Sequence, residues 1–209
     1  MLLAGDAVCA AMLAELADGR ALTSGELARA AAVDRHTAGA HLSHLAAAGL
    51  IATDHQGRHD YHRLAAAEAA PPRTTPPPPR RNSRVVTGPR DPAMRMARTC
   101  YGHLAGTLGV ALAEALAARG LIDLRAAGAA LTEAGIAPLR DFGIAPAALA
   151  CRPCLDWSER RPHIGGPLGK ALAARCFALG WIERIPGGRA VAITTCGRRG
   201  FAERFGVAL

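Results

Sequence analysis

The stretch that decides the fold is residues 20–51, RALTSGELARAAAVDRHTAGAHLSHLAAAGLI. Ser24 is a good helix N-cap and precedes a short helical segment, GELARAAA. Asp34 is a second N-cap, and from Arg35 to Ala48 leucines recur at helical spacing until Gly49 stops the helix. Two helices joined by a short turn are therefore predicted here.

The flanking segments complete a small domain. Residues 6–18 place apolar side chains at helical spacing and predict a preceding helix. Residues 50–53 predict a strand, residues 56–58 a turn, and residues 59–64 a returning strand. Helices followed by a β-hairpin are typical of a winged helix-turn-helix, which we expect over residues 1–69.

These segments closely resemble the ArsR family of bacterial repressors. The matching pieces are LADGRALTSGELARAAAVDRHTAGAHLSHLAAAGLI (residues 16–51) and QGRHDYHRL (residues 56–64). The resemblance implies a dimer that binds operator DNA and releases it when an effector arrives. Metal-sensing members place a cysteine pair in or near the recognition helix, and this stretch has none. Any inducer must therefore be sensed elsewhere in the chain.

The second helix of the pair carries the expected DNA contacts. If Leu42 and Leu45 point inward, the opposite face meets the duplex, and the N-terminal end of a recognition helix usually meets the bases. Arg58 lies at the tip of the hairpin, within reach of phosphates or the minor groove. The predicted DNA-binding residues are Arg35, His36, Thr37, Ala40, His41, Ser43, Arg58 and His59. The alternative to DNA contact is that these histidines are polar surface residues or pack between helices.

Composition narrows the class of protein. The 209-residue chain has a formal net charge of +8, and Lys170 is its only lysine, so arginine supplies nearly all of the positive charge. Guanidinium groups match phosphates and guanine edges, so the charge fits double-stranded DNA as a partner. Only 4% of the residues are aromatic, which favours helices packed through alanine and leucine.

The sequence shows no membrane-spanning or export segment. No stretch is long and apolar enough to cross a bilayer. The apolar start lacks a basic region and contains Asp6, Glu15 and Asp18, unlike a signal peptide. We therefore expect a cytoplasmic protein that does not associate with membranes and whose six cysteines are reduced.

A proline- and arginine-rich stretch, residues 70–91, divides the chain. Its prolines oppose helix formation and favour an extended spacer. The expected organisation is a DNA-binding domain (1–69), a linker (70–91) and a C-terminal sensing or dimerisation domain (92–209).

The C-terminal domain contains an internal repeat. Residues 103–122, HLAGTLGVALAEALAARGLI, match residues 163–182, HIGGPLGKALAARCFALGWI, at half of their 20 paired positions. Two copies are expected, at about 92–147 and 148–209, each with a long helix, a strand and a closing helix. The predicted fold is mainly α with small β-hairpins: a winged helix-turn-helix followed by a duplicated, winged-helix-like α/β domain.

Both copies carry a cysteine followed by a histidine. In the first copy Met96, Cys100, His103 and Thr107 are expected as one stripe on a helix, where Cys-x-x-His is metal-binding spacing. The second copy adds a polar insert, LDWSERRP, between its cysteine and its histidine. The candidate metal or effector residues are Cys100, His103, Cys154, Asp156, Trp157, Glu159 and His163. The alternative to a metal or effector site is that the cysteines and histidines are buried packing residues and that Trp157 anchors the core.

These patterns predict a homodimeric repressor, released from DNA by an effector. The effector is a soft metal or metalloid ion at Cys100 and Cys154, an oxidant acting on their thiols, or a small organic ligand near Trp157. A rival from another class is an enzyme with Cys154 as nucleophile, assisted by His163 and by Asp156 or Glu159. No recognisable catalytic motif supports that rival, so we expect no enzyme.

Overall fold

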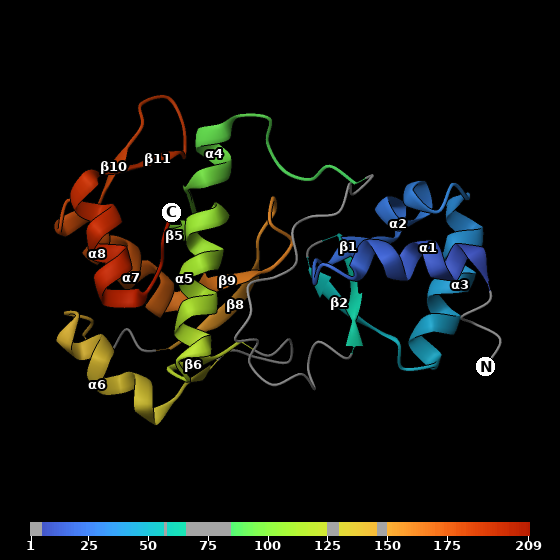
Figure 1. Ribbon diagram of the computed structural model, residues 1–209, viewed down its shortest axis with the longest axis horizontal. Coiled ribbons are helices and arrows are strands. Elements are labelled where there is room, and N and C mark those ends of the chain that lie inside the picture. The colour runs from blue at the N-terminus through green and yellow to red at the C-terminus, as the bar shows by residue number, and fades with distance from the viewer. Residues whose placement is uncertain (1–5, 57, 66–84, 125–129, 146–149) are drawn as a thin grey trace. The chain divides into compact units, whose positions relative to one another are not determined.

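The computed structural model describes residues 6–56, 58–65, 85–124, 130–145 and 150–209 (Figure 1). The chain divides into two compact units, Met1–Thr87 and Gly88–Leu209. Each unit has its own cluster of buried apolar side chains. The described residues form a mixed α/β structure of eight helices and small antiparallel strand groups.

The first unit contains the predicted helices and hairpin. Its elements are α1 (Ala7–Leu16), β1 (Leu22–Thr23), α2 (Ser24–Ala30), α3 (Arg35–Ala47), β2 (Ile51–Gln56) and β3 (His59–Leu64). The strands form an antiparallel sheet in the order β1-β3-β2, in which Ile51 pairs with Leu64 and Gln56 with His59. We call the β2–β3 hairpin the wing. The short strand β1 was absent from the sequence prediction.

The two helix starts differ in how well the sequence predicted them. Asp34 caps α3 as expected, accepting the backbone N–H groups of His36 and Thr37 at 2.8 and 3.0 Å. The predicted cap of α2 is wrong, because Ser24 is already the first helical residue and Thr23 is the cap. Thr23 has Glu26 three residues on, and the two form a reciprocal capping box, which satisfies two backbone donors instead of one.

The predicted linker reaches into both units, with residues 85–87 in the first and 88–91 in the second. Residues 66–84, which include most of the predicted stretch 70–91, lie outside the described residues. Val85 is buried against the core formed by Met12, Leu16 and their neighbours. Its carbonyl accepts a hydrogen bond from Arg20 Nη1 at 3.2 Å.

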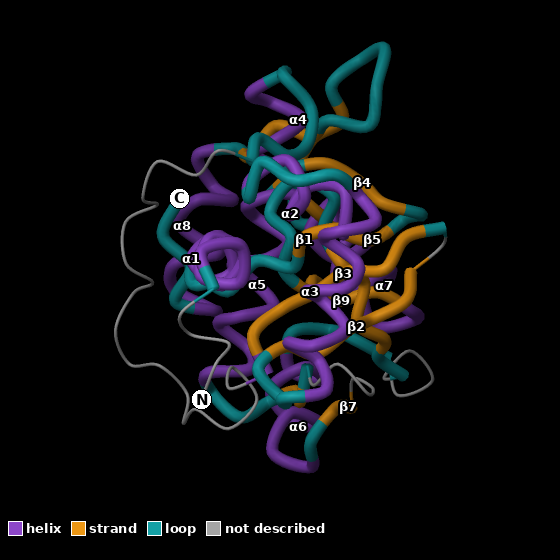
Figure 2. The backbone as a smooth tube through the Cα atoms, turned by 90° about the vertical axis from the view of Figure 1, so that its right-hand side faces the viewer, coloured by secondary structure: helices purple, strands orange, loops and turns teal. Residues whose placement is uncertain are grey.

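In the second unit the order hairpin, long helix, hairpin, shorter helix occurs twice. After α4 (Pro92–Met96), the first round comprises β4 (Arg98–Cys100), β5 (His103–Ala105), α5 (Gly106–Ala118), β6 (Ile122–Asp123), β7 (Ala130–Leu131) and α6 (Glu133–Asp141). The second comprises β8 (Arg152–Leu155), β9 (Pro162–Gly165), α7 (Gly166–Ala178), β10 (Ile182–Arg184), β11 (Val191–Ile193) and α8 (Thr195–Phe205). The strands are short beside the helices (Figure 2). Within the described residues, every helix is too short or too polar to cross a bilayer.

The long helix of each round packs against a strand of the other round. Helix α5 contacts β9 of the second round, and α7 contacts β5 of the first. A Cβ atom added at Gly109 of α5 would lie 2.6 Å from the Leu104 carbonyl oxygen and 3.7 Å from Cβ of His163. At Gly169 of α7 it would collide with the Ile164 carbonyl and lie 3.0 Å from Cβ of His103. The missing side chains let each long helix approach the histidine-bearing strand of the other round.

The predicted helical stripe of Met96, Cys100, His103 and Thr107 is wrong. Helix α4 ends at Met96, and its C-cap Ala97 is extended, with φ −152°. Cys100 and His103 then lie on the two strands of a hairpin whose turn residues, Tyr101 and Gly102, have φ of 49° and 92°. Positive φ at both central residues is the hallmark of a tight two-residue hairpin turn. Cys-x-x-His is therefore a cross-strand pair.

Candidate metal centre and nucleic-acid interface

Two hairpins bring four potential metal ligands together. Cys100 lies opposite His103 on β4–β5, and Cys154 lies opposite His163 on β8–β9. One sulfur or nitrogen atom from each of the four lies within 4.8 Å of the others, and the two histidine Nε2 atoms are 2.9 Å apart. We call these four residues the Cys/His cluster. Each round contributes one cysteine and one histidine, so the cluster joins both.

The cluster is buried on its histidine side. His103 is 5% exposed and His163 is 1% exposed, whereas both cysteines are half-buried. Histidine is seldom buried this deeply without a partner for its ring nitrogens. An incoming ion would meet the thiols first and the imidazoles behind them.

The two thiols share one ionisation. Hydrogen bonds from Cys154, His103 and His163 lower the pKa of Cys100 to about 2. The hydrogen bond to Cys100, together with burial, raises the pKa of Cys154 well above its usual range. Cys100 is therefore a thiolate at neutral pH and Cys154 its hydrogen-bond donor. The thiolate is the form of cysteine that binds metals.

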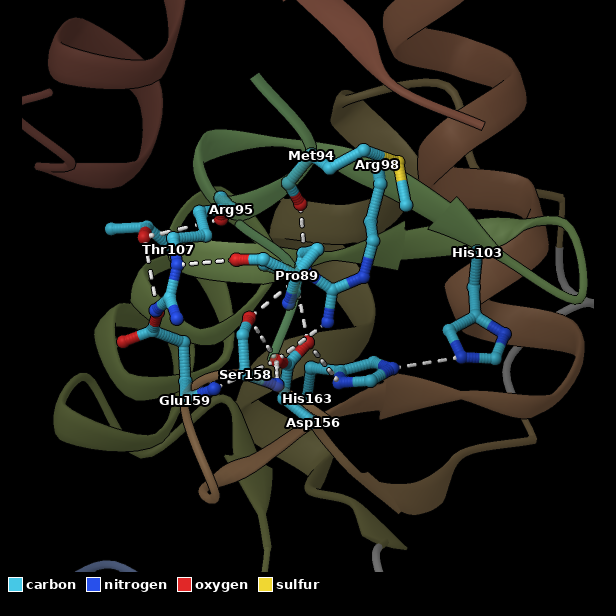
Figure 3. Close-up of polar contacts among 11 residues, drawn as sticks. Pro89, Met94, Arg95, Arg98, His103, Thr107, Asp156, Ser158, Glu159 and His163 are labelled. Atoms are coloured by element: carbon cyan, nitrogen blue, oxygen red, sulfur yellow. Dashed lines mark hydrogen bonds and ion pairs between the residues drawn. The ribbon is translucent and has the colours of Figure 1, made fainter. Parts of the chain in front are cut away.

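Asp156 organises the residues behind the cluster (Figure 3). Its Oδ2 accepts the backbone N–H of Gly106 at 2.7 Å and lies 3.3 Å from Nδ1 of His163. It thereby caps the N-terminus of α5, where the alanine N-cap has no side-chain acceptor. Its Oδ1 accepts hydrogen bonds from Arg98 Nη2 at 2.7 Å, Ser158 N at 2.8 Å, Ser158 Oγ at 2.9 Å and Glu159 N at 2.9 Å.

These contacts shift the pKa values of Asp156 and His163. Burial alone would raise the pKa of Asp156, but its hydrogen bonds and the charge of Arg98 hold that pKa far below the usual range. Burial alone would lower the pKa of His163, yet Asp156 and Cys100 raise it. Nδ1 of His163 faces Oδ2 of Asp156 at 3.3 Å as an ion pair, without a hydrogen bond of good geometry, and Nε2 faces the cluster. A carboxylate behind a histidine is the usual second partner of a metal-binding imidazole.

The remaining predicted residues lie outside the Cys/His cluster. The Trp157 side chain is 49% exposed, so it is no core anchor, and the Arg98 guanidinium lies 5.8 Å from its ring centroid. Oε1 of Glu159 accepts a hydrogen bond from the Thr107 hydroxyl at 3.3 Å. Arg98, which pairs with Asp156, is a functional residue that was not identified from the sequence. Its only signal is the repeated Arg-x-Cys of residues 98–100 and 152–154.

In the first unit, α3 presents the predicted DNA-binding face only in part. Ala38, Leu42 and Leu45 are buried, as the helical spacing requires. The exposed predicted residues are Arg35, His36, Ala40 and Ser43 on α3, and Arg58 and His59 on the wing. Arg35 opens the helix, where the macrodipole disfavours a cation, so its position does not serve helix stability.

Two residues predicted to contact DNA, both on α3, also make contacts within the unit. The Thr37 hydroxyl donates to Asp34 Oδ2 at 2.6 Å and supports the helix cap. The His41 ring lies beside α1, with Nδ1 3.3 Å from Sγ of Cys9. Both side chains are half-buried, unlike those of Arg35 and His36.

Helices α2 and α3 pack against each other through buried residues, α3 exposes its other face to solvent, and the wing follows α3. This arrangement is that of a helix-turn-helix DNA-binding protein. A family model described as a helix-turn-helix domain matches residues 4–54. The chain is also 35% identical over 205 residues to the uncharacterized HTH-type transcriptional regulator YdfF of Bacillus subtilis (strain 168), a match that covers 94% of this chain and 91% of that protein. No solved structure matches. The chain belongs to the HTH-type transcriptional regulators.

This family membership decides against the enzyme considered from the sequence. Asp156, His163 and the two thiols do lie together. However, Cys154, the suggested nucleophile, has a raised pKa and is a poor source of thiolate. The chain is a transcriptional regulator and not an enzyme.

Proposed function

We propose that this chain is a metal-responsive regulator. The first unit binds operator DNA, and the Cys/His cluster of the second unit binds a metal ion that changes operator affinity. The observation that carries the proposal is the convergence of Cys100, His103, Cys154 and His163 from both rounds of the second unit.

The ligand set favours a tetrahedral ion of soft or borderline character. Two cysteines and two histidines are a common zinc set, and thiolate with imidazole also suits Cu(I). Metal–nitrogen bonds of about 2.0–2.1 Å at tetrahedral angles separate two nitrogens by about 3.3 Å. The histidine Nε2 atoms are 2.9 Å apart, so a small outward shift would admit the ion. The raised pKa of His163 makes binding compete with protonation and weaken in acid.

The surroundings of the cluster favour a responsive ion over a permanent one. The second unit has a continuous apolar core that includes Leu108, Leu116, Leu172 and Phe201, and its folding does not rest on the ion alone. The half-buried thiols leave a path to solvent. A bound ion would favour the arrangement in which both hairpins are drawn together, and operator affinity would change by that difference.

The finer features follow the sequence. We propose a cytoplasmic, homodimeric repressor of the ArsR type, supported by the resemblance over residues 16–51 and 56–64. We also propose that residues 92–147 and 148–209 descend from one duplicated segment, joined to the DNA-binding domain by the linker 70–91. The repeated order of elements and the 60-residue spacing of His103 and His163 support the duplication.

An oxidant is the second candidate effector. The hydrogen bond between Cys154 and the Cys100 thiolate favours it, because a thiolate next to a second thiol is the arrangement that oxidants convert to a disulfide. The exposed position of Trp157 gives less support to an organic ligand at that side chain.

The proposal is tested by measuring DNA affinity with and without metal. A duplex selected from a random pool serves as operator, and the full chain is titrated with it in zinc and in chelator. We expect zinc to change the dissociation constant by about 5- to 150-fold, the usual range for coupled sites. Equal affinity in both conditions, with zinc bound, would make the ion a structural one. A response only to peroxide would favour the oxidant.

A second expectation concerns how DNA is read. Arg35 is exposed at the start of α3, and Arg35→Ala should weaken binding to the selected duplex by about 1–3 kcal/mol if the guanidinium contacts a base. Binding to random duplexes should change less. Fluorescence anisotropy on both duplexes measures the difference, and an equal loss on both would reduce Arg35 to a phosphate contact.

A further inference from the structure

A second group of ligand side chains lies in the first unit, away from the Cys/His cluster. Asp6 and Cys9 lie at the start of α1, and His41 lies on α3. Nδ1 of His41 is 3.3 Å from Sγ of Cys9 and 3.6 Å from Oδ1 of Asp6. One ligand atom from each of the three lies within 4.8 Å of the others. We infer that Asp6, Cys9 and His41 form a metal site of their own, which fastens the recognition helix to α1.

The separations of Nδ1 of His41 from the other two ligand atoms are close to those around a tetrahedral ion. Bonds of about 2.3 Å to sulfur and about 2.0–2.1 Å to nitrogen and oxygen separate sulfur from nitrogen by about 3.6 Å and oxygen from nitrogen by about 3.3 Å. The observed 3.3 and 3.6 Å each differ from those values by about 0.3 Å. Movements of this size lie within rotamer adjustment, so the ion needs no change in the backbone.

Each side chain is held where an ion could use it. Cys9 is fully buried in the core of the unit, which fixes its sulfur. The side chains of His41 and Asp6 are 22% and 38% exposed, so the site is reached from their side. Oδ1 of Asp6 caps α1 by accepting the N–H groups of Val8 and Cys9, and a carboxylate has further lone pairs for an ion.

The donor set identifies the class of ion. One thiolate, one imidazole and one carboxylate suit a borderline divalent ion such as Zn²⁺ or Co²⁺. Three protein ligands leave the fourth position to water on the exposed side. The ion would tie α1 to α3 at His41, one residue before the buried Leu42. This inference does not depend on the proposed role of the second unit.

Cobalt titration of the full chain tests the inference, because thiolate-bound Co²⁺ has a charge-transfer band in the near ultraviolet. We expect two ions per chain, and one after His41→Gln. Asp6→Asn keeps a good N-cap but removes the charge of the ligand, and should weaken the binding of that ion tenfold or more. The control His44→Gln changes an exposed histidine on the same helix, and this variant should still bind two ions per chain.

The outcomes separate this site from the Cys/His cluster. The double variant Cys100→Ser/Cys154→Ser should keep the His41-dependent ion, and the triple variant that adds His41→Gln should bind none. If His41→Gln and Asp6→Asn both bind cobalt like the parent chain, the inference is overturned while the Cys/His cluster stands. If only the Cys100→Ser/Cys154→Ser variant binds like the parent chain, the proposed function fails and this site stands. Circular dichroism establishes that each variant is folded, and Asp6→Asn decides the matter if His41→Gln is not.

Discussion

The double variant Cys100→Ser/Cys154→Ser is expected to bind zinc at the second unit at least a hundredfold more weakly than the parent chain. Loss of groups behind metal ligands typically costs 10- to 100-fold in affinity, and the loss of two ligands should exceed that. Serine is close to cysteine in size and both thiols are half-buried, so the unit should still fold. Competition with a chromophoric chelator measures the affinity, and the zinc response of operator binding should disappear with it.

Cys196→Ser is the matched control, because Cys196 is exposed on α8 and lies outside the cluster. It should bind zinc and respond to it like the parent. If the double variant does the same, the two thiols are packing residues, and a different effector must be sought around Trp157.

The second large effect is on stability. Asp156→Ala should destabilise the second unit by about 3–5 kcal/mol, because it leaves the Arg98 guanidinium buried without its carboxylate. The two side chains are 0% and 2% exposed, so bulk water does not reach the pair. The same change uncaps α5 at Gly106. Urea denaturation followed by the fluorescence of Trp157 and Trp181, both in the second unit, measures the loss.

Asp141→Ala provides the comparison, since Asp141 is an exposed aspartate at the end of α6. Its effect should stay within about 0.5 kcal/mol. Similar losses from Asp156→Ala and Asp141→Ala would mean that the Arg98 pair adds little. Should Asp156→Ala prove too unstable to purify, Asp156→Asn keeps the shape of the side chain and still removes the charge.

The sequence was most informative where structure is local. Helix spacing and the Asp34 cap are determined by near neighbours, and the helices of the first unit and the two strands of the wing occur where they were predicted. Strands β10 and β11 flank Pro186-Gly187-Gly188, a turn sequence of the same local kind. Ser24 was misassigned because Thr23 offers the same chemistry one residue earlier.

The Cys/His cluster was predicted through correspondence between the repeats, not through local structure. Cys100 and His103 were placed on a helix, because a tyrosine with positive φ at a hairpin turn has no strong sequence signal. Cys9 and His41 are 32 residues apart, and Arg98 and Asp156 are 58 apart. Such pairs are decided by tertiary packing, which single-sequence patterns do not encode.

The interlocking of α5 with β9 and of α7 with β5 has a consequence during synthesis. A ribosome adds about 5–20 residues per second, so the 60 residues from His103 to His163 take roughly 3 to 12 seconds. Throughout that interval the nascent chain already contains every residue of the helix-turn-helix, but the Cys/His cluster lacks His163 and, until residue 154 is added, Cys154 as well. Under the proposed function, a polypeptide that ends before residue 163 would contain the helix-turn-helix but would lack a complete site for the ion.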